Sequence, residues 1–288
     1  MTHSIDWRSL TRGIFAALAI GGIASPASAQ ETPAQAMISS PLTASLGAFV
    51  FNTDLNARLN GQSSSNPDVD FDNDFGRGRD ATRVRADVLW RITPKHHLRL
   101  LYFDYNNNTT RVLSQDVQWG DYTFLSGSAA TSEFKFNTTE LAYEYAFLHE
   151  TNYEVAGSLG VHYMSIKLGI SGTANIRDAN GNVTQVSSAS KEGDLPAPLP
   201  VLGVRAGWAV TPNWYLEGSG QLFRVSIDGY HGNVGDVRAN ATYMFSRHFG
   251  LGLGYDYFRT SVDVDRTNFN GHLRIGYHGL MAYLTGAF

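Results

Sequence analysis

The sequence contains no cysteine, and this absence excludes a disulfide framework as well as metal sites built from thiolates. Proline is also scarce: there are 9 prolines among 288 residues, compared with 29 glycines, 14 tyrosines and 16 phenylalanines. Aromatic side chains favour strands, so the composition indicates a β-rich protein. Because no disulfide is available, other interactions must stabilise the fold.

A long apolar run is missing after Gln30, where no window approaches 18 consecutive apolar residues. The sequence therefore predicts no membrane-spanning helix beyond that point. An excess of basic residues is missing as well, since the formal net charge is −4. This balance gives no support to nucleic-acid binding, and we expect no nucleic acid among the partners.

The first residues have the pattern of a secretory signal peptide. Arg8 and Arg12 precede a short apolar run at residues 13–23, and Ala27-Ser28-Ala29 follows. The run is shorter than the roughly 20 residues that a spanning helix needs, whereas a basic start, a short apolar run and an A-x-A site are typical of a cleaved signal. We predict a signal peptide at residues 1–29, a periplasmic N-terminal segment at residues 30–42 and a third region at residues 43–288.

Four short segments read as tight turns between apolar strand ends, at residues 92–98, 147–153, 210–216 and 245–251. Aromatic residues flank each of them, as expected for the girdle at a membrane–water interface. Longer polar connections separate these turns, at residues 60–79, 108–130, 172–195, 228–232 and 264–270. Short turns on one side and long loops on the other are typical of outer-membrane barrels.

Four short turns join five hairpins, so we predict an all-β fold, an antiparallel transmembrane β-barrel of ten strands in the outer membrane, formed by residues 43–288. Eight strands is the main alternative, and twelve is a further one. The predicted strands are residues 43–59, 80–92, 97–107, 131–147, 153–170, 198–210, 214–227, 233–246, 249–263 and 271–288.

Alternation along these strands assigns the two faces. In residues 80–92, Val84, Val88 and Trp90 share one face, and Arg85 and Arg91 share the other. The apolar set is expected to face lipid and the charged set the lumen. Two stretches break this phase, residues 133–147 and 276–279, and we interpret them as β-bulges or as strand portions above the membrane. The first strand, residues 43–59, has an apolar face that is mixed.

The last strand alternates and ends on an aromatic residue, Phe288. This pattern is typical of the C-terminal signal that barrel-assembly machinery reads, and we assign that signal to Tyr283 and Phe288.

Several stretches resemble an uncharacterised family of proteobacterial outer-membrane β-barrel proteins, small barrels of the OmpA and OmpW kind. They are residues 68–76, 89–98, 197–204 and 277–288. The resemblance covers nearly all of the chain after the predicted signal peptide. It implies a barrel in the outer membrane and assigns no functional residue.

The charges predicted to face the lumen are the most informative candidates. Unpaired charges in a narrow interior are unfavourable, so the basic and acidic sets should pair. Barrels of about eight strands leave room only for side chains, so a salt-bridged plug is favoured over a pore lined by charge rings. The predicted network contains Arg83, Arg85, Asp87, Arg91, Arg99, Glu140, Glu144, Glu154, Arg205, Glu217, Asp236, Arg238, Asp256 and Arg274.

Other candidates for chemistry are weaker. The acidic run from Asp68 to Asp74 has Asn73 and Arg79 where a calcium loop needs Gly and Glu, so we interpret it as a solvated surface loop.

His162 and Ser165 should point to opposite faces of a strand. Asp228, His231 and Asp236 lie near one outer loop and could activate a water molecule. None of these residues belongs to a recognised motif, so we predict no catalytic residue, no metal and no cofactor.

These observations favour a non-enzymatic outer-membrane barrel of a Gram-negative bacterium, with a structural role or with passage or binding of small solutes. An enzyme acting on lipid A, phospholipid or peptides is one alternative. Adhesion or recognition through residues 60–79, 108–130 and 172–195 is another. We expect a monomer whose partners are outer-membrane lipid, lipopolysaccharide and the barrel-assembly machinery.

Overall fold

The computed structural model describes residues 31–61, 66–76, 80–177, 182–227, 230–266 and 269–288. Two compact units are present, Met1–Glu31 and Thr32–Phe288. The predicted signal peptide, residues 1–29, lies outside the described residues, and the account below concerns Thr32–Phe288 alone. No helix in the described ranges is long and apolar enough to cross a membrane.

Strands make up most of this unit. The described residues contain α1 (Ala36–Ser39), β1 (Leu42–Leu59), β2 (Val69–Asp70), α2 (Phe71–Asp74), β3 (Asp80–Arg91), β4 (His96–Val112), β5 (Val117–Trp119), β6 (Tyr122–Phe124), β7 (Ala129–His149), β8 (Tyr153–Arg177), β9 (Val183–Ala209), β10 (Trp214–Ile227), β11 (Tyr230–Met244), β12 (Phe249–Arg266) and β13 (Phe269–Ala287).

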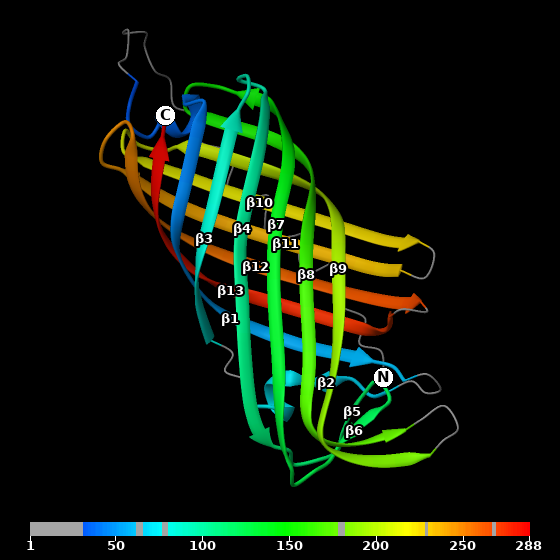
Figure 1. Ribbon diagram of the computed structural model, residues 1–288. Helices are drawn as coiled ribbons and strands as arrows, with labels where there is room; N and C mark the ends of the chain where they lie inside the picture. The colour runs from blue at the N-terminus through cyan, green and yellow to red at the C-terminus, as the bar shows by residue number, and fades with distance from the viewer. Residues whose placement is uncertain (1–30, 62–65, 77–79, 178–181, 228–229, 267–268) are drawn as a thin grey trace, which may run out of the picture. The chain divides into compact units, whose positions relative to one another are not determined.

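All strand pairings in the described residues are antiparallel, which confirms the predicted all-β antiparallel architecture. The order runs β8-β7-β4-β3-β1-β13-β12-β11-β10-β9, and β9 pairs with β8 in turn. The pairings therefore follow a ring through ten long strands, which cross the unit obliquely (Figure 1). The three short strands β2, β5 and β6 belong to the long connections. We call the inside of the ring the lumen.

The outer face of the ring carries apolar side chains at alternate positions. On β12, Leu251, Leu253 and Tyr255 are exposed, whereas Gly252 and Gly254 between them are buried. The remaining long strands repeat the pattern with residues such as Leu159 on β8 and Leu284 on β13. These side chains form a belt around the outside of the ring.

Aromatic residues fill one part of the lumen. Phe49 and Phe51 of β1 contact Phe103 of β4 and Tyr277 of β13, with ring centroids 5.8 to 6.0 Å apart. Phe103 and Tyr277 contact each other at 5.3 Å. Phe258 stacks on Tyr277 at 4.7 Å. This cluster explains the mixed first strand, because the two phenylalanines point inward while Leu46 and Val50 are exposed.

The predicted phase break at residues 276–279 is absent, and the one predicted within residues 133–147 is confined to the end of that stretch. The pairing of β7 with β4 runs without a shift from Ala129 to Tyr145, and the pairings of β13 run unbroken through residues 276–279. Phe134 and Phe136 face inward on the same parity as Glu140. The prediction assumed a polar interior along the entire strand, whereas the lumen is apolar in one part and charged in another. The one register shift of β7 in these pairings lies between Ala146 and Leu148, at the end of the predicted stretch.

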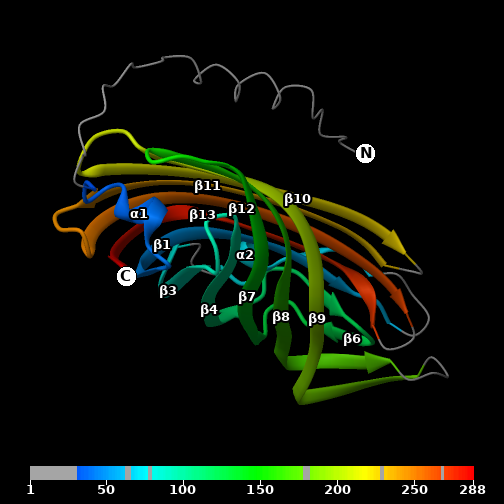
Figure 2. The ribbon, with the colours of Figure 1, turned by 90° about the horizontal axis from the view of Figure 1, so that it is seen from above.

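Helix α1 closes one end of the ring, which we call the terminal end because Phe288 lies there (Figure 2). Ala34, Met37 and Ile38 are buried in a cluster with residues of the barrel strands and their ends, namely Ala209, Tyr215, Met244 and Ala287. The sequence indicated only a polar lead-in at residues 30–42. The segment is folded because its few apolar side chains reach this cluster.

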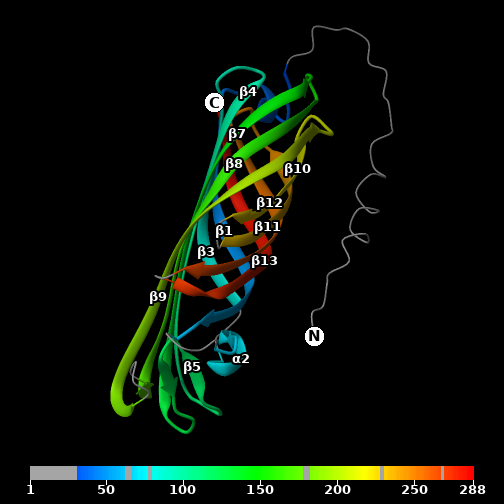
Figure 3. The same ribbon diagram turned by 90° about the vertical axis from the view of Figure 1, so that its right-hand side faces the viewer.

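Helix α2 and the β5–β6 hairpin lie at the opposite end, the loop end (Figure 3). The hairpin turns at Gly120-Asp121, where Gly120 has φ +63°, a conformation that favours glycine. Phe71 and Phe75 of the acidic run are buried, and Phe71 contacts the ring of Trp119 at 5.5 Å. The solvated surface loop predicted at residues 68–74 is therefore wrong, because its aromatic side chains join the lumen core.

Removing one lumen aromatic should destabilise the protein strongly. Phe51 is 2% exposed, whereas its neighbour Val50 is 52% exposed. Because Phe51→Ala leaves a cavity in the aromatic cluster, we expect a loss of about 3–5 kcal/mol in the free energy of unfolding. The matched variant Val50→Ala should lose less than about 1 kcal/mol. Urea unfolding from phospholipid vesicles, followed by tryptophan fluorescence, measures both; equal losses would contradict an aromatic core in the lumen.

Candidate functional site

The charged part of the lumen lies between the aromatic cluster and α1. It consists of inward-facing side chains from β3, β4, β7, β8, β9, β10, β11 and β12, and we call it the charge layer. It brings together twelve of the fourteen charges predicted from the sequence, namely Arg85, Asp87, Arg91, Arg99, Glu140, Glu144, Glu154, Arg205, Glu217, Asp236, Arg238 and Asp256.

Arg205 of β9 lies at the centre of one group in this layer. Its Nε donates to Glu144 Oε2 at 2.7 Å, and its Nη2 donates to Glu154 Oε1 at 2.5 Å. All three side chains are buried. Two carboxylates from β7 and β8 are thus held by one guanidinium from β9, so the group ties three neighbouring strands together from the inside.

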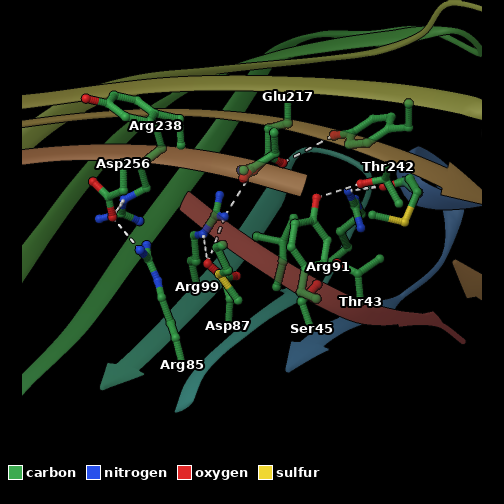
Figure 4. A pocket seen from close by; sticks show the side chains of 18 residues that line it. Thr43, Ser45, Arg85, Asp87, Arg91, Arg99, Glu217, Arg238, Thr242 and Asp256 are labelled. Atoms are coloured by element: carbon green, nitrogen blue, oxygen red, sulfur yellow. Dashed lines mark hydrogen bonds and ion pairs between the residues drawn. The ribbon is translucent and has the colours of Figure 1, made fainter. Parts of the chain in front are cut away.

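Arg99 of β4 connects two sides of the ring. Its guanidinium donates to Asp87 Oδ2 of β3 at 2.9 and 3.1 Å and to Glu217 Oε1 of β10 at 3.0 Å (Figure 4). Strands β4 and β10 are not neighbours in the pairing order. This contact therefore crosses the lumen, and Tyr215 supports it by donating to Glu217 Oε2 at 3.3 Å.

A second group surrounds Arg238 of β11. Its Nη2 donates to Glu140 Oε2 and to Asp236 Oδ2, both at 2.6 Å. Asp256 lies 3.8 Å from Arg238 Nε and also accepts a hydrogen bond from Arg85 Nη1. Arg85 lies over the ring of Phe49 at 5.3 Å, so this group lies against the aromatic cluster.

Arg91 links the charge layer to α1. Its Nη2 donates to the carbonyl oxygen of Met37 at 2.6 Å, and its Nη1 donates to that of Ser40 at 3.1 Å. Glu154 lies 3.7 Å from the same guanidinium. The carbonyl groups at the end of α1 are thereby satisfied inside the lumen.

Two predicted members lie outside the charge layer. Arg274 is on the outer face and exposed, because β13 directs Leu273 and Ile275 inward. Its assignment to the lumen is wrong, since the face was chosen on the assumption that charges point inward. Arg83 lies nearer the loop end, donates to the carbonyl oxygen of Asn106 at 2.7 Å and contacts the ring of Tyr105. It forms no ion pair with a carboxylate of the described residues.

Sequence reasoning missed the neutral and titratable partners of the layer. His97 lies 3.7 Å from Glu154, and Gln221 donates to Glu140 Oε1 at 2.5 Å. His162 Nε2 lies 2.7 Å from Gln221 Oε1. The signal that could have found them is their spacing, because residues an even number of positions apart on a strand share a face. His97 is two positions from Arg99, His162 is eight from Glu154, and Gln221 is four from Glu217.

The layer encloses a cavity of about 60 Å³, which has room for roughly four water molecules. Charged and hydroxyl side chains form most of its polar lining, and Met37 of α1 and Met281 of β13 border it as well. Figure 4 shows the labelled ion pairs Arg85–Asp256 and Arg99–Glu217 at this cavity. Two buried atoms of residues that line the cavity, Arg238 Nε and Asp256 Oδ1, have no hydrogen-bond partner in the described residues. A few ordered waters in the cavity can supply those partners.

Metal chemistry is not favoured by these contacts. Glu140, His162 and Asp236 each offer a ligand atom, and these atoms lie within 4.8 Å of one another. The guanidinium of Arg238 already donates to both carboxylates. A cation would have to displace this buried arginine, so the trio acts as part of the ion-pair network.

The candidate catalytic groups from the sequence do not converge. His162 is buried and Ser165 is exposed, on opposite faces of β8 as predicted. His231 is on the outer face, 2.7 Å from Ser226 Oγ, whereas Asp236 faces the lumen. Asp228 lies outside the described residues.

The two residues of the predicted assembly signal occupy different faces. Tyr283 lines the cavity, with its hydroxyl 2.8 Å from Thr242 Oγ1. Phe288 is exposed at the terminal end, and its backbone pairs with that of Leu42 at 2.8 and 2.9 Å. The last residue therefore completes the pairing of β13 with β1. Its role in assembly stays a prediction.

Replacing Arg205 should be far more damaging than replacing Arg83. Because Arg205→Gln leaves two buried carboxylates without their shared partner, we expect a loss of about 3–5 kcal/mol in the free energy of unfolding. Arg83→Gln, which removes a guanidinium with no carboxylate partner in the described ranges, should lose less than about 1 kcal/mol. Adding Glu144→Gln to Arg205→Gln should restore part of the loss, because one uncompensated charge disappears. Strictly additive losses in urea unfolding would contradict the pairing.

No known protein family and no curated protein sequence matches this chain. Among solved structures, the chain is similar to the outer membrane protease OmpT from Escherichia coli, with 12% identity, 86% of this chain and 96% of that chain covered, and a TM-score of 0.54. Matches with lower TM-scores include the toluene transporter TodX from P. putida (9% identity, 89% and 92% covered, 0.37) and the outer membrane protein OprG from Pseudomonas aeruginosa (10% identity, 86% and 96% covered, 0.36). The likeness to OmpT shows the fold alone, that of an outer-membrane β-barrel protein.

Proposed function

We propose that this chain is a non-enzymatic protein of the Gram-negative outer membrane, a closed ten-stranded barrel whose lumen is filled and does not conduct ions. Its role would be structural, with the loop end facing outward. The observation that carries this proposal is the filled lumen, in which α1, the charge layer and the aromatic cluster follow one another along the barrel.

The outer face supports a membrane location. Large apolar side chains such as Leu253, Leu280 and Leu222 are about two-thirds exposed. Soluble proteins rarely leave a contiguous apolar surface of this extent in water. A hydrocarbon environment would instead be favourable for this belt, and a closed ring leaves no unpaired strand edge within it.

The lumen supports a non-conducting barrel for electrostatic and steric reasons. An ion entering from the terminal end would have to pass Met37 and the buried pairs of Arg99 and Arg205. It would then meet the aromatic cluster, whose phenylalanine rings offer no polar ligand to replace its hydration shell. Passage therefore requires rearrangement of both layers.

The enzyme alternative is less favoured by the geometry. His272 Nδ1 lies 2.6 Å from Asp263 Oδ1. In the same row across the neighbouring strands, His231 lies within hydrogen-bond distance of Ser226. These side chains are on the outer face of the ring near the loop end, away from the cavity in the charge layer. The protease activity of OmpT belongs to that protein, since the likeness covers the fold alone.

One observation favours recognition as a second candidate function. Strands β8 and β9 stay paired from Tyr153–Trp208 to Arg177–Val183, whereas β9 pairs with β10 only as far as Leu202. Pro198 and Pro200 lie directly beyond that point, and proline cannot donate to a neighbouring strand. The β8–β9 hairpin is therefore separate from β10 at the loop end and would offer a surface for a partner.

Conductance measurements test the filled lumen. The purified protein should give no conductance steps in planar lipid bilayers, because the aromatic cluster and the charge layer obstruct the path. A general porin reconstituted in the same bilayers serves as the positive control. Reproducible steps from the wild-type protein would contradict the proposal.

Fractionation tests the location. We expect the mature protein in the outer-membrane fraction, with a gel mobility that changes on heating because a folded barrel resists detergent until it is boiled. Recovery as a soluble periplasmic protein would overturn the membrane assignment regardless of conductance.

A further inference from the structure

The apolar belt ends at one row of the outer face toward the loop end. Tyr257 of β12 pairs with His278 of β13, which pairs with Asn52 of β1. Beyond this row the outward positions are small, polar or charged on all three strands, and they include the acidic Asp54 and Asp263 as well as arginines. The row therefore marks the boundary of the belt on this side of the ring.

Three exposed arginines lie just beyond that boundary, and we call them the arginine patch: Arg224, Arg259 and Arg274. Arg259 is two residues beyond Tyr257 on β12. Arg274 faces Ser261 on the neighbouring strand, so it is the diagonal neighbour of Arg259. Arg224 belongs to the same row as Arg274, through Asn233 and Ser261.

The patch differs from the other cations on the outer face. Lys167 lies 2.7 Å from Glu192, Lys135 is paired with Glu133, and Arg58 lies 3.5 Å from Asp68. Each of those charges thus has a carboxylate partner within the protein. The three arginines of the patch form no hydrogen bond or ion pair through their side chains with any residue in the described ranges.

The space beside Arg259 is open on the side of β11. Its two cross-strand neighbours are Gly235 of β11 and Gly276 of β13. A Cβ atom at Gly235 would have nothing within 4 Å, and one at Gly276 would meet only ordinary contacts. The Asp54 carboxylate lies over Gly276 on the β13 side, whereas no side chain lies over Gly235, so an anionic group can approach this guanidinium from the β11 side.

The spacing of the patch defines what would fit. Arg224 and Arg274 are three interstrand steps apart, which is roughly 14 Å. Guanidinium groups bind phosphates with paired hydrogen bonds. A ligand with acyl chains against Tyr257 and the belt, and with two separated phosphates beyond it, would match both the apolar and the basic surface. Asp54, across from Gly276, is an acidic neighbour that a ligand would have to avoid.

We propose that the arginine patch binds the phosphates of a lipid A-type glycolipid in the outer leaflet. The proposal rests on the outer-membrane location proposed above. Arg259 and Arg274 would hold one phosphate, and Arg224 would reach the second. The acyl chains would lie on the belt below Tyr257, so the site would hold the glycolipid against the strands from β10 to β13.

Native mass spectrometry of the purified full-length mature protein tests the site, with bisphosphorylated lipid A and with the same glycolipid after removal of both phosphates. The wild-type protein should prefer the phosphorylated form, and Arg259→Gln/Arg274→Gln should weaken its binding at least about fivefold, since two charge-assisted contacts are lost. Lys135→Gln is the matched control, because it removes an outer-face cation that already has a partner.

Heat-modifiable gel mobility establishes that each variant is folded before binding is compared. Equal binding by the double variant and the wild type, or equal binding of both glycolipids, would overturn the arginine patch as a phosphate site and leave the barrel proposal intact. A wild-type protein that never enters the outer-membrane fraction would instead locate the failure in the proposed function.

Discussion

Arg205 donates to Glu144 and Glu154 from inside a ring of strands, and its contacts show the constraint that governs this protein. A narrow β-ring encloses a space that only side chains can fill. Any charge placed there loses its hydration and must find a partner. Arg205, Arg99 and Arg238 each satisfy two carboxylates at once, so the charge layer is compact enough to occupy the lumen.

The two parts of the lumen are filled by different kinds of side chain. Near the terminal end, charges are paired and Arg91 extends the network to the carbonyl groups of α1. Toward the loop end, Phe49, Phe51 and Phe103 replace charges with apolar packing. Arg85 joins the two, since it bonds Asp256 and lies over Phe49. Neither part alone would fill the ring, and together they favour a barrel without a passage.

Side chains on the outer face differ from those in the lumen, because they are exposed to the environment and are not paired inside the ring. Leu253 and Leu280 belong to the belt, and the arginine patch begins two residues past Tyr257. Arginines with no partner in the described part of the protein are readily explained at a boundary where anionic headgroups would replace the missing carboxylates. In the proposed membrane location, the belt and the patch would form two halves of one lipid-facing surface.

Much of this was predictable from the sequence because a strand has a period of two. Alternation around Val84 and Arg85 assigned the faces of β3, and the same rule selected twelve charges that meet in the charge layer. The turns at residues 92–98 and 210–216 placed the strand ends near Arg91 and Trp214. Alternation and turn positions depend on residues that are close together in the sequence, so both can be predicted from the sequence alone.

Other features depended on contacts between distant segments. Alternation gives two faces without saying which one is inside. Arg274 was misplaced, and a phase break was predicted around Phe134, because polarity was used to decide. Burial of Phe71 against Trp119, and of Met37 beneath Tyr215, arises from segments far apart in the sequence. The sequence by itself determined the strands and their alternation, since both are local. Only the tertiary structure decided which side chains fill the lumen, because that depends on which strands meet across it.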